Sequence, residues 1–87
     1  MDFEFDPAKS ATNKAKHGID FVEAQAIWND ANRLEIPARS TTEPRSQIVG
    51  RIHQTTWAAL VTYRHEKIRI ISVRRARKNE EAQYLAR

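Results

Sequence analysis

The sequence contains no cysteine, and this absence limits both its chemistry and its setting. Disulfide bonds and thiolate metal sites are excluded, so we expect a protein of the reducing cytoplasm. No apolar run approaches the roughly 18 residues that a membrane-spanning helix needs, so we expect no contact with a membrane. The first residues, MDFEFDP, are acidic and lack the apolar stretch of a secretory signal, which argues against export.

Glycine and proline are also scarce, with two and three residues, and no repeat or low-complexity tract interrupts the chain. Hydrophobic residues make up 40% and charged residues 30% of the 87 residues, which is the composition of a folded globular domain. A chain of this length forms one domain, so we predict a single domain over residues 1–87 with a modest core.

Positive charge is concentrated in one segment. Residues 64–78 hold seven basic residues against Glu66 alone, a net charge of +6, while the rest of the chain carries −2. A local basic field recruits polyanions, chiefly nucleic acid, and speeds their encounter with the protein. We therefore expect a nucleic-acid partner, and the alternative is a solvated charged face with no partner.

Hydrophobic periodicity and turn residues predict an α+β domain with a mostly antiparallel sheet and helices packed on one face. The elements follow the order β-α-α-β-β-β-β-α over residues 2–5, 7–17, 19–28, 33–37, 45–53, 56–64, 68–74 and 78–87, with a loop over 38–44. In strand 68–74 the apolar residues occupy both sides, which predicts a central strand covered on both faces.

Each predicted helix carries an apolar stripe that we expect to face the core. In the first helix the stripe is Ala8, Ala11 and Ala15. In the second helix it is Phe21, Ala24, Ile27 and Trp28, with Asp20 and Glu23 at capping-box spacing. In the last helix it is Ala82, Leu85 and Ala86.

Two separated segments resemble one family. FEFDPAKSATNKAKHGIDFVEA resembles the opening of the BrnT toxins, which read Phe-x-Trp-Asp-Pro-x-Lys, then Asn, then Lys-His-Gly, then Phe-x-x-Ala. IRIISVRRARKNEEAQY resembles their second signature, an Ile-Arg-Ile-Ile-Ser-x-Arg strand followed by a helix with Glu and Tyr. The resemblance covers nearly the whole chain.

The resemblance implies a fold, an activity and a partner. BrnT proteins are toxins of type II toxin–antitoxin pairs, have a RelE-like fold, and act as ribonucleases that shut down translation. Their antitoxin is a ribbon-helix-helix (BrnA-like) protein that blocks the toxin and binds the operator, so operator DNA is reached only through the antitoxin.

Two positions depart from the family pattern. Phe5 stands where the family has Trp, a mild change in the core. Arg77 stands where Ser or Thr caps the last helix, although the acidic residue three positions on is kept as Glu80. Because such a cap is worth about 1 kcal/mol, we expect this helix to fray or to begin later, with Asn79 as the cap.

RNA cleavage without a metal needs a base for the 2′-hydroxyl proton, cations for the charge on phosphorus, and an acid for the departing 5′-oxygen. The resemblance suggests this route, which leaves a cyclic phosphate. The chain has no HxxxH pair and no clustered carboxylates outside its first strand, so we predict neither a metal nor another cofactor.

Arg74 and Arg75 are the leading candidates for holding the phosphate, because guanidinium forms two parallel hydrogen bonds with it and stays charged. Adjacent strand residues point to opposite faces, so we expect only one of them to meet the scissile phosphate. By parity, Arg69 lies with Arg75. The alternative for the pair is a surface position or a salt bridge to Glu80 or Glu81.

His17 is the candidate acid or base, since histidine ordinarily titrates near neutral pH. Its alternative is a residue that merely ends a helix beside Gly18. Lys16 is a candidate phosphate contact, on the strength of the family match, and otherwise an exposed lysine. Tyr84 is a candidate donor to phosphate or a base-stacking residue, and otherwise packs its ring on the sheet.

Further basic and aromatic residues are candidates for RNA binding without a catalytic role. They are Arg45, Arg51, Tyr63, Arg69, Arg77 and Lys78. For Tyr63 the alternative is core packing, and for the arginines it is a solvent-facing strand side. His53 and His65 fall in predicted turns and receive no role.

The leading hypothesis is a metal-independent endoribonuclease toxin. A non-catalytic nucleic-acid-binding module would use the same basic segment without a titrating group. A protein-interaction subunit would use the basic surface only to dock an acidic partner.

Overall fold

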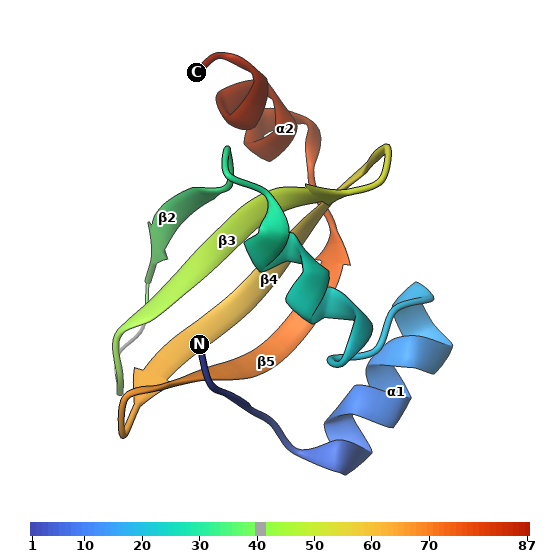
Figure 1. Ribbon diagram of the computed structural model, residues 1–87, viewed down its shortest axis with the longest axis vertical. Coiled ribbons are helices and arrows are strands. Elements are labelled where there is room, and N and C mark those ends of the chain that lie inside the picture. Colours follow the sequence, from blue (N-terminus) through green and yellow to red (C-terminus); the bar gives the residue numbers. More distant parts are fainter. Residues whose placement is uncertain (40–41) are drawn as a thin grey trace.

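The computed structural model describes residues 1–39 and 42–87, which fold into a five-stranded sheet with helices around it (Figure 1). The elements are β1 (Phe3–Glu4), α1 (Pro7–His17), the 3₁₀ helix η1 (Glu23–Asn29), β2 (Leu34–Ala38), β3 (Arg45–Ile52), β4 (Thr55–Arg64), β5 (Lys67–Arg75) and α2 (Lys78–Leu85). The predicted order and the α+β class are confirmed. Two residues of the predicted loop, 40 and 41, lie outside the described residues. No described helix is long and apolar enough to cross a bilayer.

The strands lie in the order β1-β5-β4-β3-β2. Strands β2 to β5 pair as successive antiparallel neighbours, whereas β1 pairs with β5 in parallel, with Phe3 opposite Ile68. The sheet is therefore mostly antiparallel, as predicted. Because β1 is only two residues long, most of the outer edge of β5 is left to other partners.

A bulge in β5 changes which way its side chains point. Leu60 pairs with Ser72 and Val61 pairs with Ile70, so Ile71 has no partner in β4. One extra residue reverses the alternation of the strand beyond it. Ile70 and Val73 consequently share the core face, and Ile71 is half-buried. The prediction that β5 is apolar on both faces is wrong for this reason.

The same bulge redistributes the arginines of β5. Arg74 pairs with Ala58 and Arg69 pairs with Thr62, so both lie on the face opposite the core. Arg75 pairs with Trp57 on the core face. The predicted grouping of Arg69 with Arg75 is wrong, because parity counted from the sequence does not include the extra residue.

The core lies between one face of the sheet and the layer formed by η1 and the chain that joins it to α1. Its buried members are Ile19, Phe21, Ala24, Ile27, Ile48, Ala59, Val61, Ile68, Ile70 and Val73. Two edge-to-face pairs extend it, Phe3 with Trp28 at 4.9 Å and Phe5 with Phe21 at 5.7 Å between ring centroids. Apolar burial on this face is the main source of stability.

The predicted second helix is a seven-residue 3₁₀ helix. Its capping box is confirmed: the Glu23 amide donates to the Asp20 carboxylate at 2.7 Å, and the Asp20 amide donates to the Glu23 carboxylate at 3.0 Å. The predicted stripe also packs inward, with Ala24 and Ile27 fully buried. A side chain at Gly50 would lie 3.0 Å from the Ile27 side chain, so η1 approaches β3 where β3 has no side chain.

Helix α1 is attached by polar groups, not by its alanines. Ala8, Ala11 and Ala15 are exposed, whereas Ser10 and Asn13 are buried. The Asn13 amide donates to the carbonyls of Ile19 and Val73, at 2.8 and 2.9 Å, and accepts from the Val73 amide at 3.2 Å. The predicted alanine stripe is wrong, because the free edge of β5 offers hydrogen bonds that a polar helix face satisfies.

Ser10 makes the second polar attachment of α1. Its hydroxyl accepts from the Phe21 amide at 2.9 Å and so holds the chain that enters η1. Helix α1 begins and ends as predicted, with Asp6 accepting from the Ala8 amide and Gly18 in the left-handed region at φ 80°.

Helix α2 does not join the other helices on the core face. Its buried residue, Glu80, bonds Arg74 on the opposite face, while Leu85 is 58% exposed. The predicted stripe of Ala82, Leu85 and Ala86 is wrong, since all three are exposed. The prediction of helices on one face therefore holds for α1 and η1 only.

The predicted late start of α2 is also wrong. The helix begins at Lys78 after Arg77, whose amide donates to the Glu80 carboxylate at 2.8 Å. Glu80 thus satisfies the first amide without a Ser or Thr cap, and Asn79 is not needed for it.

Replacing Asn13 with Ala should lower the free energy of unfolding by about 2–4 kcal/mol, because three buried backbone groups lose their partner. The exposed Ala11→Gln should change it by less than about 0.5 kcal/mol. Urea unfolding of both variants tests which face of α1 carries the attachment. A larger loss for Ala11→Gln than for Asn13→Ala would reject it.

Candidate active site

A shallow groove of about 310 Å³ lies between α1 and β5. It is lined by Ala8, Lys9, Thr12, Asn13, Lys16, His17, Ile71 and Ser72. Three of these side chains are basic, two carry hydroxyl groups, and none is acidic. A surface of this composition suits an anionic ligand with several oxygen atoms.

The helical repeat explains why these residues share the groove. Lys9, Thr12 and Lys16 are spaced by three and four residues, so they lie on one face of α1. The Asn13 bond to Val73 turns this face along the edge of β5. Ser72 and Ile71 come from the bulge, which places them at that edge.

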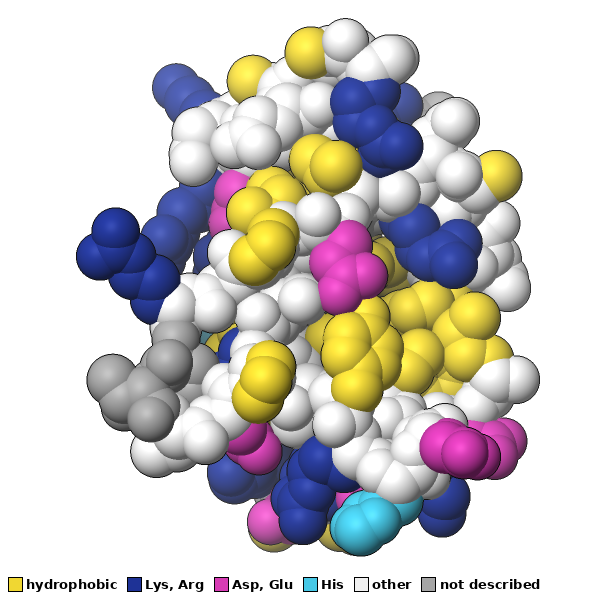
Figure 2. Space-filling model, turned by 90° about the vertical axis from the view of Figure 1, so that its left-hand side faces the viewer, with side chains coloured by type: hydrophobic (Ala, Val, Ile, Leu, Met, Phe, Trp, Pro, Cys, Tyr) yellow, Lys and Arg dark blue, Asp and Glu magenta, His cyan; other side chains and the backbone are white. Residues whose placement is uncertain are grey.

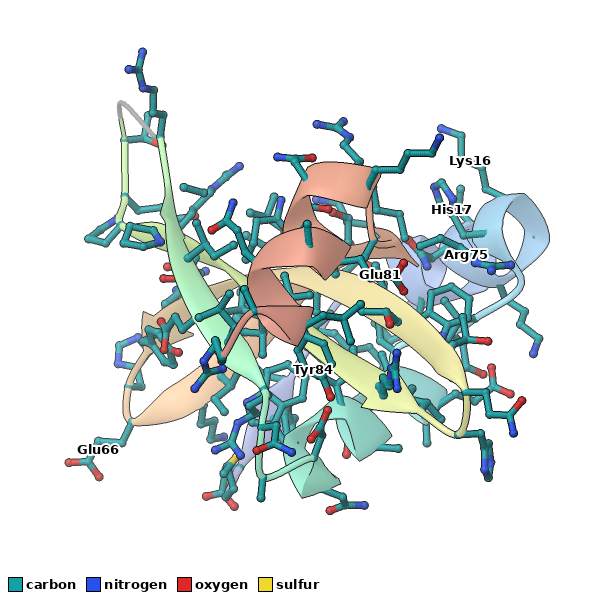
Figure 3. All side chains as sticks on the ribbon, turned by 90° about the horizontal axis from the view of Figure 1, so that it is seen from above. Lys16, His17, Glu66, Arg75, Glu81 and Tyr84 are labelled. Atoms are coloured by element: carbon teal, nitrogen blue, oxygen red, sulfur yellow. The ribbon has the colours of Figure 1, made fainter. Side chains whose placement is uncertain are left out.

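Exposed cations extend from the groove to the end of β5. Lys16 and His17, which line the groove, lie on the same side of the molecule as Arg75 (Figure 3). We call these three residues the basic corner. Arg77 and Lys78 follow Arg75 in the chain and are also exposed. Within residues 1–39 and 42–87, none of these five side chains forms an ion pair.

Arg74 is engaged within the protein. Its guanidinium forms two bonds with the Glu80 carboxylate, at 2.7 and 2.9 Å, and its side chain is 24% exposed. These hydrogen bonds raise the pKa of Arg74 and, with the Arg77 amide, hold the pKa of Glu80 below its ordinary value. The salt bridge considered from the sequence is therefore present, and it fixes the connection between β5 and α2.

The arginines predicted to bind RNA from the sheet lie on the same face as Arg74. Arg69 pairs with Glu4 at 2.9 Å, and Arg45 pairs with Glu43 at 3.5 Å. The Arg51 guanidinium lies 5.7 Å from the centre of the Tyr84 ring. Each predicted RNA-binding arginine of this face thus already contacts a carboxylate or an aromatic ring of the protein.

The Tyr84 hydroxyl donates to Asp30, which also accepts from the Arg51 amide at 2.9 Å. This bond raises the pKa of Tyr84. Burial raises the pKa of Asp30, but the hydrogen bonds from Tyr84 and the backbone outweigh it, so that the pKa is lowered. Tyr84 ties α2 to the end of η1, in agreement with packing on the sheet.

Tyr63 lies on the core face near the C-terminal end of β4, whereas Trp57, the partner of Arg75, lies near its start. Apolar side chains gather in a patch on the β2 side of the molecule (Figure 2). There, a hollow of about 460 Å³ is lined by Met1, Trp28, Ala31, Arg33, Glu35, Ile48, Tyr63 and Ile68. Burial and a 2.8 Å hydrogen bond to Glu35 raise the pKa of Tyr63 to about 12. The structure therefore separates Tyr63 from the basic corner.

The comparison with protein families identifies the chain. Residues 5–80 match the model described as "Ribonuclease toxin, BrnT, of type II toxin-antitoxin system". The chain belongs to the BrnT family. The comparison with curated proteins gives no match.

Membership of the BrnT family makes the protein a ribonuclease toxin with RNA as substrate and an antitoxin as partner. The matched residues include the whole groove and the basic corner, whereas Tyr84 lies beyond them. Of the predicted catalytic residues, Lys16 and His17 line one groove, and Arg75 lies on the same side of the molecule. It places Arg74 and Tyr84 in internal bonds.

Sequence reasoning missed Lys9, Thr12 and Ser72 as residues of the groove between α1 and β5. The spacing of Lys9, Thr12 and Lys16 on one helical face could have found the first two. Ser72 had no such signal, because its position depends on the bulge. Among the described residues, no three His, Cys, Asp or Glu side chains lie together as metal ligands would.

The Arg74–Glu80 pair makes the stability of this BrnT protein depend on acid pH. Because the pKa of Glu80 is lowered by folding, the carboxylate stabilises the protein above its ordinary pKa of 4.5. This stabilisation should disappear as the pH falls from 4.5 through the lower pKa of the folded state.

Urea unfolding of wild type and Glu80→Gln from pH 3 to pH 6 measures this contribution. Wild type should gain more stability over the range than the variant. Glu66→Gln, in the exposed turn before β5, is the matched control and should follow wild type. Parallel curves for wild type and Glu80→Gln would contradict the assignment.

Proposed function

We propose that this BrnT protein is a metal-independent endoribonuclease that inhibits translation, with the α1–β5 groove as its active site. The observation that supports it is a groove with three basic side chains, two hydroxyl groups and no carboxylate, open to the basic corner. Such a site attracts the phosphodiester backbone of RNA. No carboxylate of the groove competes with the phosphates for its basic side chains.

In the proposed reaction the 2′-oxygen of the RNA bonds to phosphorus while the bond from phosphorus to the 5′-oxygen breaks. The products are a 2′,3′-cyclic phosphate and a free 5′-hydroxyl group. One proton leaves the 2′-hydroxyl and one reaches the 5′-oxygen. His17 carries the imidazole of the groove, and an imidazole can act as the acid or the base in one of these transfers.

Negative charge grows on the phosphate oxygens as the 2′-oxygen attacks. We assign its stabilisation to Lys16 and Arg75, the ammonium and guanidinium groups of the basic corner. Both are exposed and, among the described residues, form no ion pair. Guanidinium can bind two oxygens of the phosphate at once, whereas ammonium acts as a point charge.

Arg74 and Tyr84 act as positioning residues and do not touch the RNA. The Arg74–Glu80 bonds hold the strand-to-helix connection that carries Arg75, and Tyr84 holds α2 through Asp30. Arg77 and Lys78 bind the RNA backbone beyond the groove. Arg45 and Arg69 contribute less, because Glu43 and Glu4 already offset their charge. Arg51 contributes less because its guanidinium lies against the Tyr84 ring.

The family implies an antitoxin, and we propose that it is a ribbon-helix-helix protein that carries the toxin to operator DNA. Inhibition of translation then places the toxin in the cytoplasm with its RNA substrate. A non-catalytic nucleic-acid-binding module remains the competing function, since it would use the same exposed cations.

His17→Ala should lower the rate of RNA cleavage about 10²–10⁴-fold by removing a proton carrier. Lys16→Ala and Arg75→Ala should lower it about 10²–10³-fold by removing charge stabilisation. Lys67→Ala, an exposed lysine at the start of β5, is the matched control and should cleave like wild type.

The assay uses labelled single-stranded RNA in EDTA, with circular dichroism to confirm folding. Cyclic-phosphate ends are the expected product. Wild-type cleavage that requires Mg²⁺ would reject metal independence, and binding without any cleavage would favour the nucleic-acid-binding module.

The salt dependence of RNA binding distinguishes free from paired arginines. Each phosphate contact on single-stranded RNA contributes about 0.7 to the slope of log affinity against log salt concentration. Arg77→Ala should reduce the slope by about this amount. Arg69→Ala should change it less, because Glu4 already neutralises Arg69. Filter binding at salt concentrations of roughly 50 to 300 mM measures the slope for both variants. Equal changes in slope would contradict the distinction between free and paired arginines.

A further inference from the structure

A second groove lies beside the basic corner. It has a volume of about 450 Å³ and lies between the loop that leaves α1 and the β3–β4 hairpin. Its lining is Gly18, Ile19, Glu23, Ile52, His53, Thr55 and Trp57. We call it the Trp57 groove. In Figure 1 the hairpin turn and the end of α1 lie on the same side of the molecule.

The walls of the Trp57 groove are part of the folded core. Ile19 is 4% exposed, and Ile52 and Trp57 pack against the buried cluster. The groove therefore exists before anything binds, and filling it would cost little rearrangement. Its apolar walls favour an apolar side chain over a polar one.

A carboxylate lines the groove, but it is already paired, and exposed cations neighbour the lining residues. Its carboxylate, Glu23, is already bonded to Lys14 at 2.8 and 3.0 Å and to the Asp20 amide. Trp57 pairs across the sheet with Arg75, and Gly18 directly follows Lys16 and His17. An apolar hollow is thus bordered by the exposed cations of the basic corner.

We propose that the Trp57 groove is the docking site of the antitoxin, and that it receives an apolar side chain from an acidic segment of that protein. The carboxylates flanking this side chain would bind Arg75, Lys16 and His17. This inference rests on the proposed function, because it treats those three residues as the active site. RNA and antitoxin then exclude each other by competing for the same cations.

A protein segment fits the Trp57 groove better than an RNA base does. Ile19 and Ile52 offer no hydrogen bond to the polar edge of a base, and Glu23 is already bonded to Lys14. A base edge would therefore depend on the side chains of His53, Thr55 and Trp57 for its hydrogen bonds. An apolar side chain loses nothing there. The negative charge that the basic corner requires would come from Asp or Glu on the same segment.

His53 allows a test that leaves the active site untouched. It lines the Trp57 groove, and its φ of 57° is the left-handed conformation that Asp tolerates. His65 occupies the equivalent left-handed position, φ 53°, in the turn at the opposite end of the sheet. His53→Asp and His65→Asp are therefore a matched pair that differ in their distance from the groove.

The probe is the purified product of the reading frame adjacent to the toxin gene. His53→Asp should weaken its binding, and its inhibition of RNA cleavage, at least tenfold, because the new carboxylate repels an acidic segment. His65→Asp should leave both within twofold of wild type. RNA cleavage without the probe should stay within twofold for both variants.

Thr55→Tyr is a second variant, which fills the groove from β4 and should weaken the probe equally. Binding that is unchanged in both groove variants, or no binding of the probe, would overturn the docking site. A parallel loss of RNA cleavage in His53→Asp would overturn it too, and would assign the groove to RNA.

The proposed function is decided separately by wild-type cleavage without the probe. If wild type does not cleave RNA but the probe still binds in a way that depends on the groove, the docking site stands and the nuclease assignment fails.

Discussion

The placement of α1 depends on the amide of Asn13. Its nitrogen and oxygen satisfy the carbonyl and the amide of Val73 as a neighbouring strand would, at the part of β5 that β1 does not reach. The same amide also holds Ile19, where the chain leaves the helix. One side chain thus sets the separation between α1 and β5, and with it the width of the groove that carries Lys16 and His17.

Helix α2 is attached on the same principle at the other side of the sheet. Glu80 binds Arg74 and the Arg77 amide, and Tyr84 binds Asp30. Hydrogen bonds and ion pairs of this kind contribute modest net stability, because their groups were solvated in the unfolded chain. They do impose direction, however, which apolar contact alone does not. The basic residues at both ends of the β5–α2 connection are held in defined places by this polar frame.

The sequence was informative about elements and about family, and less so about faces. The order of the elements along the chain, the α1 boundaries and the Asp20–Glu23 capping box were predicted because they depend on local residues. The inward face of α1 was not, since a stripe of alanines is the usual sign of packing and here the polar side is buried. A helix docked on a strand edge follows hydrogen-bonding needs that no periodicity reports.

The arrangement of the candidate site was predictable only in part. His17 and Lys16 were found through their chemistry and the family motif, and the structure places them in one groove. Which face of the sheet Arg74 and Arg75 each occupy depends on a single bulged residue, Ile71. This bulge has no signature in the sequence. Internal pairing of Arg74 followed, because the bulge turned it toward the helix that carries Glu80.

The polar attachment of α1 also affects where the molecule opens most easily. Regions with few buried apolar contacts unfold locally at lower free energy than the core strands do. Apart from Ser10 and Asn13, the residues of α1 are exposed, while the sheet keeps the buried cluster. The helix that carries Lys16 and His17 can therefore detach locally while the sheet stays folded, so that the molecule combines a stable scaffold with an adaptable wall at its candidate site.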